Sequence, residues 1–222
     1  MKLSAYDEVC NWEKSEAVYT LQKCGLREGM VAMDLGCGLA HYTIPAALTV
    51  GRQGRVIAVD HDKKACKTAY QRIQDAGITN VEMLRANHIE LEHIPESSID
   101  FLMIYDMIHG NARIEMYPVV KRLLKKGGIL SFLAFDEIRY QKSLDGQLIK
   151  SNQGKNMRDT YDIALKKMHD EIISNGFALD SIVENGGVHF DHFHSPYHWK
   201  KYGEVRLETL ERGNIYNFVK QI

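Results

Sequence analysis

The sequence lacks the features that mark nucleic-acid-binding and membrane-spanning proteins. Its 222 residues include 28 Lys and Arg and 29 Asp and Glu, which gives a formal net charge of −1 at pH 7. Without a basic excess the chain has no electrostatic footprint for a phosphate backbone, so we expect no nucleic-acid partner. No apolar run approaches the ~20 residues needed to cross a bilayer, so we expect no membrane partner.

Cysteine is scarce, and its spacing excludes two further kinds of structure. The four cysteines are dispersed and form no C-x-x-C pair: Cys10, Cys24, Cys37 and Cys66. This pattern argues against both a structural zinc site and a disulfide framework. The N-terminal residues are polar and contain no signal-peptide core. We therefore expect a cytoplasmic protein with reduced thiols.

Five short apolar runs alternate with helical patterns along the chain. Runs of this kind, separated by helices, are typical of strands buried on both faces of a parallel sheet. The pattern predicts an α/β fold built from right-handed strand–helix–strand units. The predicted strands are residues 30–35, 55–60, 81–86, 99–106 and 128–135.

The predicted helices have recognisable ends. Gly77 and Gly176 are placed to end two of them with a left-handed residue. In a third, Pro118 suits the first helical position, and Lys125 and Lys126 lie at the negative end of the helix dipole. A further helix is predicted near the N-terminus, over residues 12–24.

Three segments fall outside this alternation within a predicted single domain of residues 1–222. Residues 1–26 form an N-terminal helical extension. Residues 136–157 are polar, and we expect them to form a lid over the acceptor site together with the N-terminal helix. Residues 177–187 and 214–222 are predicted to form two terminal strands.

A glycine-rich loop follows the first predicted strand, in the sequence VAMDLGCGLAHY of residues 31–42. Gly36 permits a tight turn, and Gly38 lets a ligand approach the backbone without meeting a side chain. Ligands of open α/β sheets bind at the carboxyl ends of the strands, where this loop lies. The dinucleotide fingerprint G-x-G-x-x-G is incomplete, because His41 stands at its third glycine position.

Two carboxylates near this loop indicate the kind of ligand. Asp34, two residues before Gly36, is expected at the rim of the loop, where it would repel a pyrophosphate and attract a cation. S-adenosylmethionine (SAM) carries an α-ammonium and a sulfonium and no phosphate, so Asp34 favours SAM. Asp60 ends the second strand, at the distance where an acidic side chain binds a ribose diol. NAD enzymes share that device, and Asp60 has the alternative role of capping the following helix.

These segments together resemble a known family. VAMDLGCGLAHYTIPAA and GRVIAVDHD resemble the first two motifs of the class I, Rossmann-like SAM-dependent methyltransferases. LRANHIELEHIP, IDFLMIYDMIH and LLKKGGILSFLAF resemble later motifs in the right order, so the resemblance covers residues 26–135. It implies an open, doubly wound, mostly parallel sheet of seven strands with helices on both faces and an antiparallel C-terminal strand.

The resemblance also implies SAM as cofactor, S-adenosyl-L-homocysteine as product and a set of cofactor-binding residues. Asp34, Gly36, Cys37 and Gly38 would surround the methionine part, and Tyr42 would shield it, while His41 would crowd the loop. Around the adenosine, Asp60 would bind the ribose hydroxyls, His61 would lie against the adenine, and Asn87 with the backbone of His88 would meet its edge. Tyr105 and Asp106 would lie near the sulfonium and the acceptor.

Histidines are the candidates for a catalytic base. Methyl transfer from a sulfonium chiefly requires alignment, and a base is needed only when the nucleophile must lose a proton. His109 follows the fourth strand, and His194 lies in the histidine-rich residues 189–198. That stretch has three open interpretations: acceptor contact, a metal site or a polar strand edge. Because no third ligand stands at a recognisable offset, we assign no metal site.

The sequence thus predicts a SAM-dependent methyltransferase that transfers a methyl group to a small-molecule acceptor by in-line displacement. An NAD-type oxidoreductase, and a SAM-binding protein without turnover that acts through a partner, are the alternatives. The attacking atom (O, N, S or C), the acceptor, and the choice between monomer and homodimer do not follow from the residues.

Overall fold

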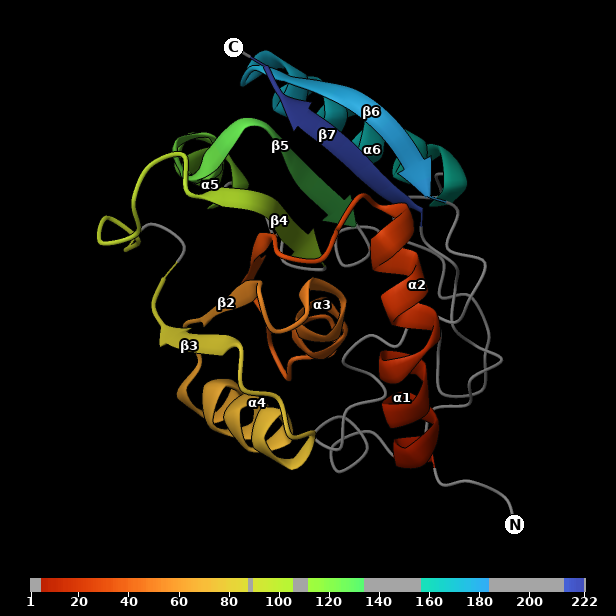
Figure 1. Cartoon of the computed structure of the whole chain (residues 1–222). Coiled ribbons are helices and arrows are strands. Elements are labelled where there is room, and N and C mark those ends of the chain that lie inside the picture. Colours follow the sequence, from red (N-terminus) through yellow and green to blue (C-terminus); the bar gives the residue numbers. More distant parts are fainter. Residues whose placement is uncertain (1–4, 88–89, 106–111, 134–156, 184–213, 222) are drawn as a thin grey trace.

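Seven strands form one sheet, with helices on both of its faces (Figure 1). The computed structural model describes residues 5–87, 90–105, 112–133, 157–183 and 214–221. The strands are β1 (Val31–Leu35), β2 (Arg55–Asp60), β3 (Val81–Arg85), β4 (Ile99–Tyr105), β5 (Leu124–Leu133), β6 (Phe177–Val183) and β7 (Ile215–Lys220). The helices are α1 (Ala5–Lys14), α2 (Glu16–Lys23), α3 (Thr43–Val50), α4 (Lys63–Asp75), α5 (Ala112–Leu123) and α6 (Met157–Ser174).

The strand order is β3-β2-β1-β4-β5-β7-β6, so the order reverses at β1, the strand that the glycine loop follows. From β1 the chain runs outward to β2 and β3, then returns to lay β4 on the other side of β1. Ligands of such sheets bind at this reversal, outside the carboxyl ends of the strands. β7 is antiparallel to both β5 and β6. The predicted fold class, with its antiparallel C-terminal strand, is confirmed.

Two apolar cores lie on opposite faces of the sheet. Alternation along β4 sends Phe101, Met103 and Tyr105 into the core beneath α1–α4, and Leu102 and Ile104 into the core beneath α5 and α6. At one end of the molecule lie β3 and α4, and at the other lie β6, β7 and α6 (Figure 1). No helix in the described residues is both long and apolar enough to span a membrane.

The N-terminal extension is two helices, whereas the sequence pattern predicted one over residues 12–24. The first helix, α1, begins at Ala5 and ends at Lys14, and α2 begins at Glu16. Between them Ser15 leaves the helical backbone region, and its hydroxyl donates to the carbonyl of Asn11 at 2.6 Å. Serine competes with the helix in this way, because its side chain bonds the backbone locally. Both helices pack on α3.

The boundary between α5 and β5 also differs from the prediction. Pro118 lies inside α5 and not at its first position, because the helix extends back to bury Met116 and Tyr117 in the core. Burial of those two side chains outweighs the backbone hydrogen bond that proline cannot make. Lys125 and Lys126, predicted at the end of the helix, belong to β5, whose pairing with β4 is interrupted by a bulge. Gly77 and Gly176 end α4 and α6 with positive φ, as predicted.

Gly54 precedes β2 and gives a test of the packing that holds this strand. A Cβ at this position would lie 2.6 Å from the carbonyl oxygen of Met30 and 2.7 Å from that of Val50. Backbone oxygens cannot rotate away, so Gly54→Ala should lower the free energy of unfolding by about 3 kcal/mol in urea denaturation. The control is Gly77→Ala, where φ is +69° but nothing lies within 4 Å, and there we expect a loss of about 1 kcal/mol. Equal losses would contradict the close approach at Gly54.

Candidate functional site

The loop of residues 36–42 connects the end of β1 to the start of α3. Gly36 and Gly38 have φ values of +82° and +51°, in the left-handed region that glycine adopts without strain. A Cβ added at Gly38 would meet nothing within 4 Å. Space beside the loop is therefore open on the side of Gly38, where a ligand can reach the backbone.

The amides of the loop are already bonded within the protein. The amides of Gly36 and Cys37 donate to the carbonyl of Val59 at 2.8 and 2.9 Å, and that of Gly38 donates to Asp60 Oδ2 at 2.9 Å. A phosphate site at the start of a helix relies on amides that point freely at the anion. These three amides are engaged, so the loop is poorly suited to a diphosphate. This argument is independent of Asp34.

Asp60 is held at the end of β2 with part of its hydrogen-bonding capacity unused. Oδ2 accepts from Gly38, and Oδ1 accepts from the amide of Asp62 at 2.8 Å. Each carboxylate oxygen has two lone pairs, so one on each oxygen suits the two hydroxyls of a ribose. The alternative role of Asp60 as the cap of α4 is wrong. Asp62 caps that helix by accepting from the amides of Lys64 and Ala65, both at 2.7 Å.

Asp34 lies beneath the loop and not at its open rim, which corrects the expected position. Its side chain is buried, and the hydroxyl of Thr43 donates to Oδ2 at 2.5 Å. Burial raises the pKa of Asp34 to about 7, and the negative charge of Asp60 acts in the same direction. A positive ligand nearby would favour the ionised carboxylate. Thr43 itself was not singled out from the sequence, although it stands at the first turn of α3.

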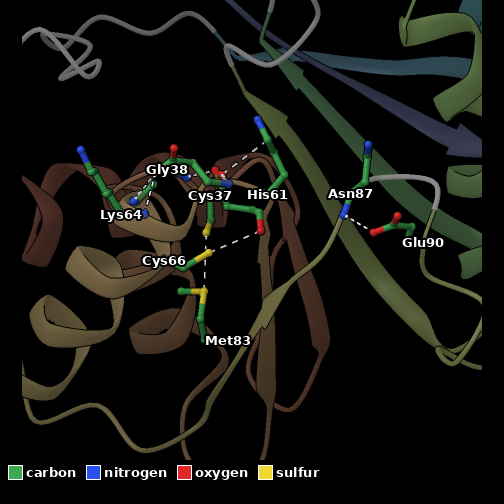
Figure 2. Close-up of polar contacts among 11 residues, drawn as sticks. Cys37, Gly38, His61, Lys64, Cys66, Met83, Asn87 and Glu90 are labelled. Atoms are coloured by element: carbon green, nitrogen blue, oxygen red, sulfur yellow. Dashed lines mark hydrogen bonds and ion pairs between the residues drawn. The ribbon is translucent and has the colours of Figure 1, made fainter.

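The side chain of Cys37 points into the protein. Its thiol is buried, with Sγ 4.0 Å from Sδ of Met83, as Figure 2 shows. Burial, chiefly, holds the pKa of Cys37 well above its usual value. Cys37 can therefore contribute its backbone, and not its thiol, to a site at the loop.

His61 and Asn87 lie along the same edge of the sheet as Gly38 (Figure 2). The side chain of His61 is 84% exposed, with Nδ1 3.7 Å from Asp60 Oδ1. Asn87 is also exposed, and its backbone amide donates to Glu90 Oε2 at 3.3 Å. Both side chains are accessible to an adenine bound near Asp60, and their contacts with it stay predictions.

Tyr42, the last residue of the loop, and Tyr105, the last residue of β4, form an aromatic layer. Their rings meet edge to face with centroids 4.5 Å apart, and Tyr42 meets Trp12 of α1 at 5.5 Å. The hydroxyl of Tyr105 hydrogen-bonds Ser131 Oγ at 2.6 Å, and burial raises the pKa of this phenol well above its usual value. Tyr105 therefore offers the site a ring and not a free hydroxyl.

The side chain of His41 does not crowd the loop but turns away from it into a buried ionic cluster. Its Nδ1 lies 2.6 Å from Oε1 of Glu13 in α1, and Nη2 of Arg72 in α4 lies 2.6 Å from the same oxygen. Arg72 also donates through Nη1 to the carbonyl of Leu39. No local pattern in the sequence indicates this cluster, because its members are 28 to 59 residues apart.

Several predicted residues lie outside the part of the chain that the structure describes. They are His88, Asp106, both catalytic candidates His109 and His194, the expected lid at 136–157 and the stretch 189–198. Among the described residues, no group of three or more His, Cys, Asp or Glu is arranged to hold a metal ion.

Comparison with known proteins identifies the family. A family model described as a methyltransferase domain matches residues 26–191, which is more than half of the chain. The chain belongs to this methyltransferase family. Together with the strand order, this match confirms the class I, Rossmann-like methyltransferase predicted from the sequence.

Individual relatives agree with the family. The chain is 27% identical to a demethylmenaquinone methyltransferase of Geobacillus stearothermophilus over 119 residues, which are 53% of this chain and 49% of the relative. It spans about half the length of the curated relatives it matches.

Solved structures share the fold at low sequence identity. A SAM-dependent methyltransferase from Aquifex aeolicus matches with a TM-score of 0.60 and 18% identity, covering 98% of this chain and 100% of that one. A putative rRNA methylase from Clostridium thermocellum matches with a TM-score of 0.55 and 13% identity, covering 100% and 98%. The proteins that share this fold include a putative rRNA methylase, so the fold does not by itself select an acceptor.

The buried Asp34 makes stability depend on pH in a defined direction. Its pKa rises from 3.8 in the unfolded chain to about 7 on folding, so its contribution is full below about pH 4 and is lost as pH rises through 7. Asp34→Asn removes this loss. The free energy of unfolding of Asp34→Asn minus that of the wild type, measured by urea denaturation, should therefore be roughly 3 kcal/mol larger at pH 8 than at pH 4.

Asp62→Asn is the matched control, with the opposite sign. Hydrogen bonds, first from the amide of Ala65, lower the pKa of Asp62, so its contribution is lost as pH falls and not as it rises. The deficit of Asp62→Asn against the wild type should thus shrink toward acidic pH. Parallel pH curves for wild type and Asp34→Asn would contradict the raised pKa of Asp34.

Proposed function

We propose that this chain is a SAM-dependent methyltransferase that acts on a small-molecule acceptor by in-line displacement. The observation that carries the proposal is the position of Asp60, fixed at the glycine loop by the amide of Gly38 with two acceptor sites unused. The family match supports the reaction class. The engaged amides of the loop argue against the runner-up, an NAD-type oxidoreductase, because a dinucleotide brings a diphosphate to this turn.

The residues present fit SAM by their chemistry. Asp60 suits the ribose diol, the open side of Gly38 gives access to the backbone, and His61 and Asn87 are accessible at the adenosine end. Asp34 supplies a negative charge beneath the loop once it is ionised. When bound, SAM supplies a methyl group on a positive sulfur. The protein has to orient this group toward the acceptor and exclude water.

Two observations support a small acceptor over a nucleic acid. Curated relatives are named for methylation of demethylmenaquinone, a small molecule. The formal net charge of −1 gives the chain no basic excess for a phosphate backbone. If the attacking atom must lose a proton, His109 and His194 are the proposed bases.

Calorimetric titration tests the cofactor assignment. SAM should bind the wild type, and NAD should not. Asp60→Ala should weaken SAM binding by about 1–3 kcal/mol, because charged hydrogen bonds to the ribose are lost. The control is Asp75→Ala, which removes a carboxylate that accepts from Gln71 on the exposed face of α4 and should bind SAM as the wild type does. Wild-type affinity in Asp60→Ala would refute the ribose assignment.

Turnover tests the reaction and the acceptor class. With SAM and a panel of quinols, phenols, amines and thiols, the chain should release S-adenosyl-L-homocysteine and a product heavier by one methylene, detected by mass spectrometry. Incubation with total RNA should give no methylated nucleotide. Methyl transfer to RNA would contradict the small-molecule acceptor. Tight SAM binding without release of product across the panel would favour a SAM-binding protein that acts without turnover.

A further inference from the structure

Three charged or ionisable side chains from distant parts of the chain meet beside the glycine loop. They are Glu13 of α1, His41 of the loop and Arg72 of α4, which we call the loop clamp. All three are buried, with 2%, 7% and 7% of their surface exposed. Buried charges are costly unless paired, so such a cluster restricts how the three elements can be arranged.

The hydrogen bonds of the loop clamp converge on a single oxygen. Nδ1 of His41 lies 2.6 Å from Glu13 Oε1, and since an ionised carboxylate oxygen only accepts, the Nδ1–H tautomer of His41 donates to it. The guanidinium of Arg72 donates to the same oxygen at 2.6 Å. Glu13 therefore joins a loop residue to a helix residue, and it is the member that α1 contributes.

The loop clamp is hydrogen-bonded to the residues on both sides of a strained residue, Ala40. Ala40 is fully buried and has a φ of +69°, a conformation that L-residues other than Asn and Asp rarely adopt. On one side of it the carbonyl of Leu39 accepts from Arg72, and on the other side His41 is bonded to Glu13. Strained backbone persists only where the surrounding structure fixes it. The backbone of Ala40 is itself bonded to Cys37 and Ile44, and the clamp adds a constraint on each side of it.

We propose that Glu13 is a positioning residue for cofactor binding: through His41 and Arg72 it holds the strained loop of residues 36–42 in its binding geometry. The inference rests on the proposed use of this loop for SAM. Glu13 contacts no cofactor itself. Trp12, its neighbour in α1, packs on Tyr42, the residue that follows His41, so the same helix contacts two consecutive residues at this end of the loop.

The consequence for binding is a loss of the competent loop population. When only a fraction of the molecules keeps the binding geometry, the apparent dissociation constant rises by the reciprocal of that fraction. Glu13→Gln keeps the size of the side chain and removes its charge, and it should raise the Kd for SAM roughly tenfold. In a double variant with Ala40→Gly, the loop adopts the same backbone without strain, so affinity should return to within about twofold of the Ala40→Gly protein.

Three measurements separate positioning from a general loss of structure. Asp100→Asn is the matched control, since Asp100 pairs with Lys125 at 2.7 Å and bonds the amide of Val31, at the opposite ends of the strands. It should bind SAM like the wild type. The double variant Glu13→Gln/Arg72→Met removes both buried charges, so no unpaired guanidinium is left. Its affinity for SAM should be lower than that of the wild type by tenfold or more. Hydrogen exchange of the ligand-free proteins should show faster exchange of amides 36–42 in both Glu13 variants and not in Asp100→Asn.

The outcomes distinguish this inference from the proposed function. If the wild type does not bind SAM, the proposed function fails, and exchange of the loop amides still decides whether Glu13 holds the loop. Unchanged loop exchange in both Glu13 variants overturns the clamp. Unchanged SAM affinity in both, or no recovery with Ala40→Gly, overturns its role in binding.

Discussion

The site depends on one hydrogen bond, from the amide of Gly38 to the carboxylate of Asp60. It joins the loop after β1 to the end of β2, two strands that are already paired through Leu35 and Val59. Because the bond uses one lone pair of Oδ2, Asp60 is fixed in place and keeps acceptors for a ligand. It also engages an amide that an anion would otherwise use. A single contact thus orients the carboxylate that we propose for ribose binding and engages an amide that a phosphate would need.

The second constraint is electrostatic. Asp34 and Asp60 place two acidic groups at neighbouring strand ends, and burial together with this proximity raises the pKa of Asp34 to about 7. The arrangement is unfavourable for the free protein above neutral pH, and a positive charge nearby offsets it. In the proposed complex, a sulfonium nucleoside would gain affinity from the same charge that destabilises the ligand-free fold. The expectation that Asp34 favours a cation stays a prediction, and the raised pKa of Asp34 makes it dependent on pH.

The sequence predicts those features that depend on local pattern. Apolar runs placed β2 at its observed bounds, and Gly77 and Gly176 marked helix ends, because these signals act over a few residues. The misplaced features depend on distant partners: Pro118 lies within α5 because its neighbours are buried by the sheet. Asp34 was expected at the rim of the loop, and it is instead buried, where Thr43 of α3 donates a hydrogen bond to it. Pairings across 28 and 59 residues, such as those of Glu13, leave no mark in the local sequence.

The loop clamp joins residues inside the family match to a helix that precedes it. The family match begins at residue 26, so the loop and α4 lie inside the shared domain while Glu13 lies before it. Within the shared part, an alanine occupies a left-handed position of the loop that glycine would occupy freely. A strained loop needs support from outside itself. Helix α1 provides it through Glu13, whose charge is buried and paired with Arg72 when the helix is docked. The geometry of the cofactor loop and the docking of α1 are therefore linked: whatever displaces this helix also releases the loop.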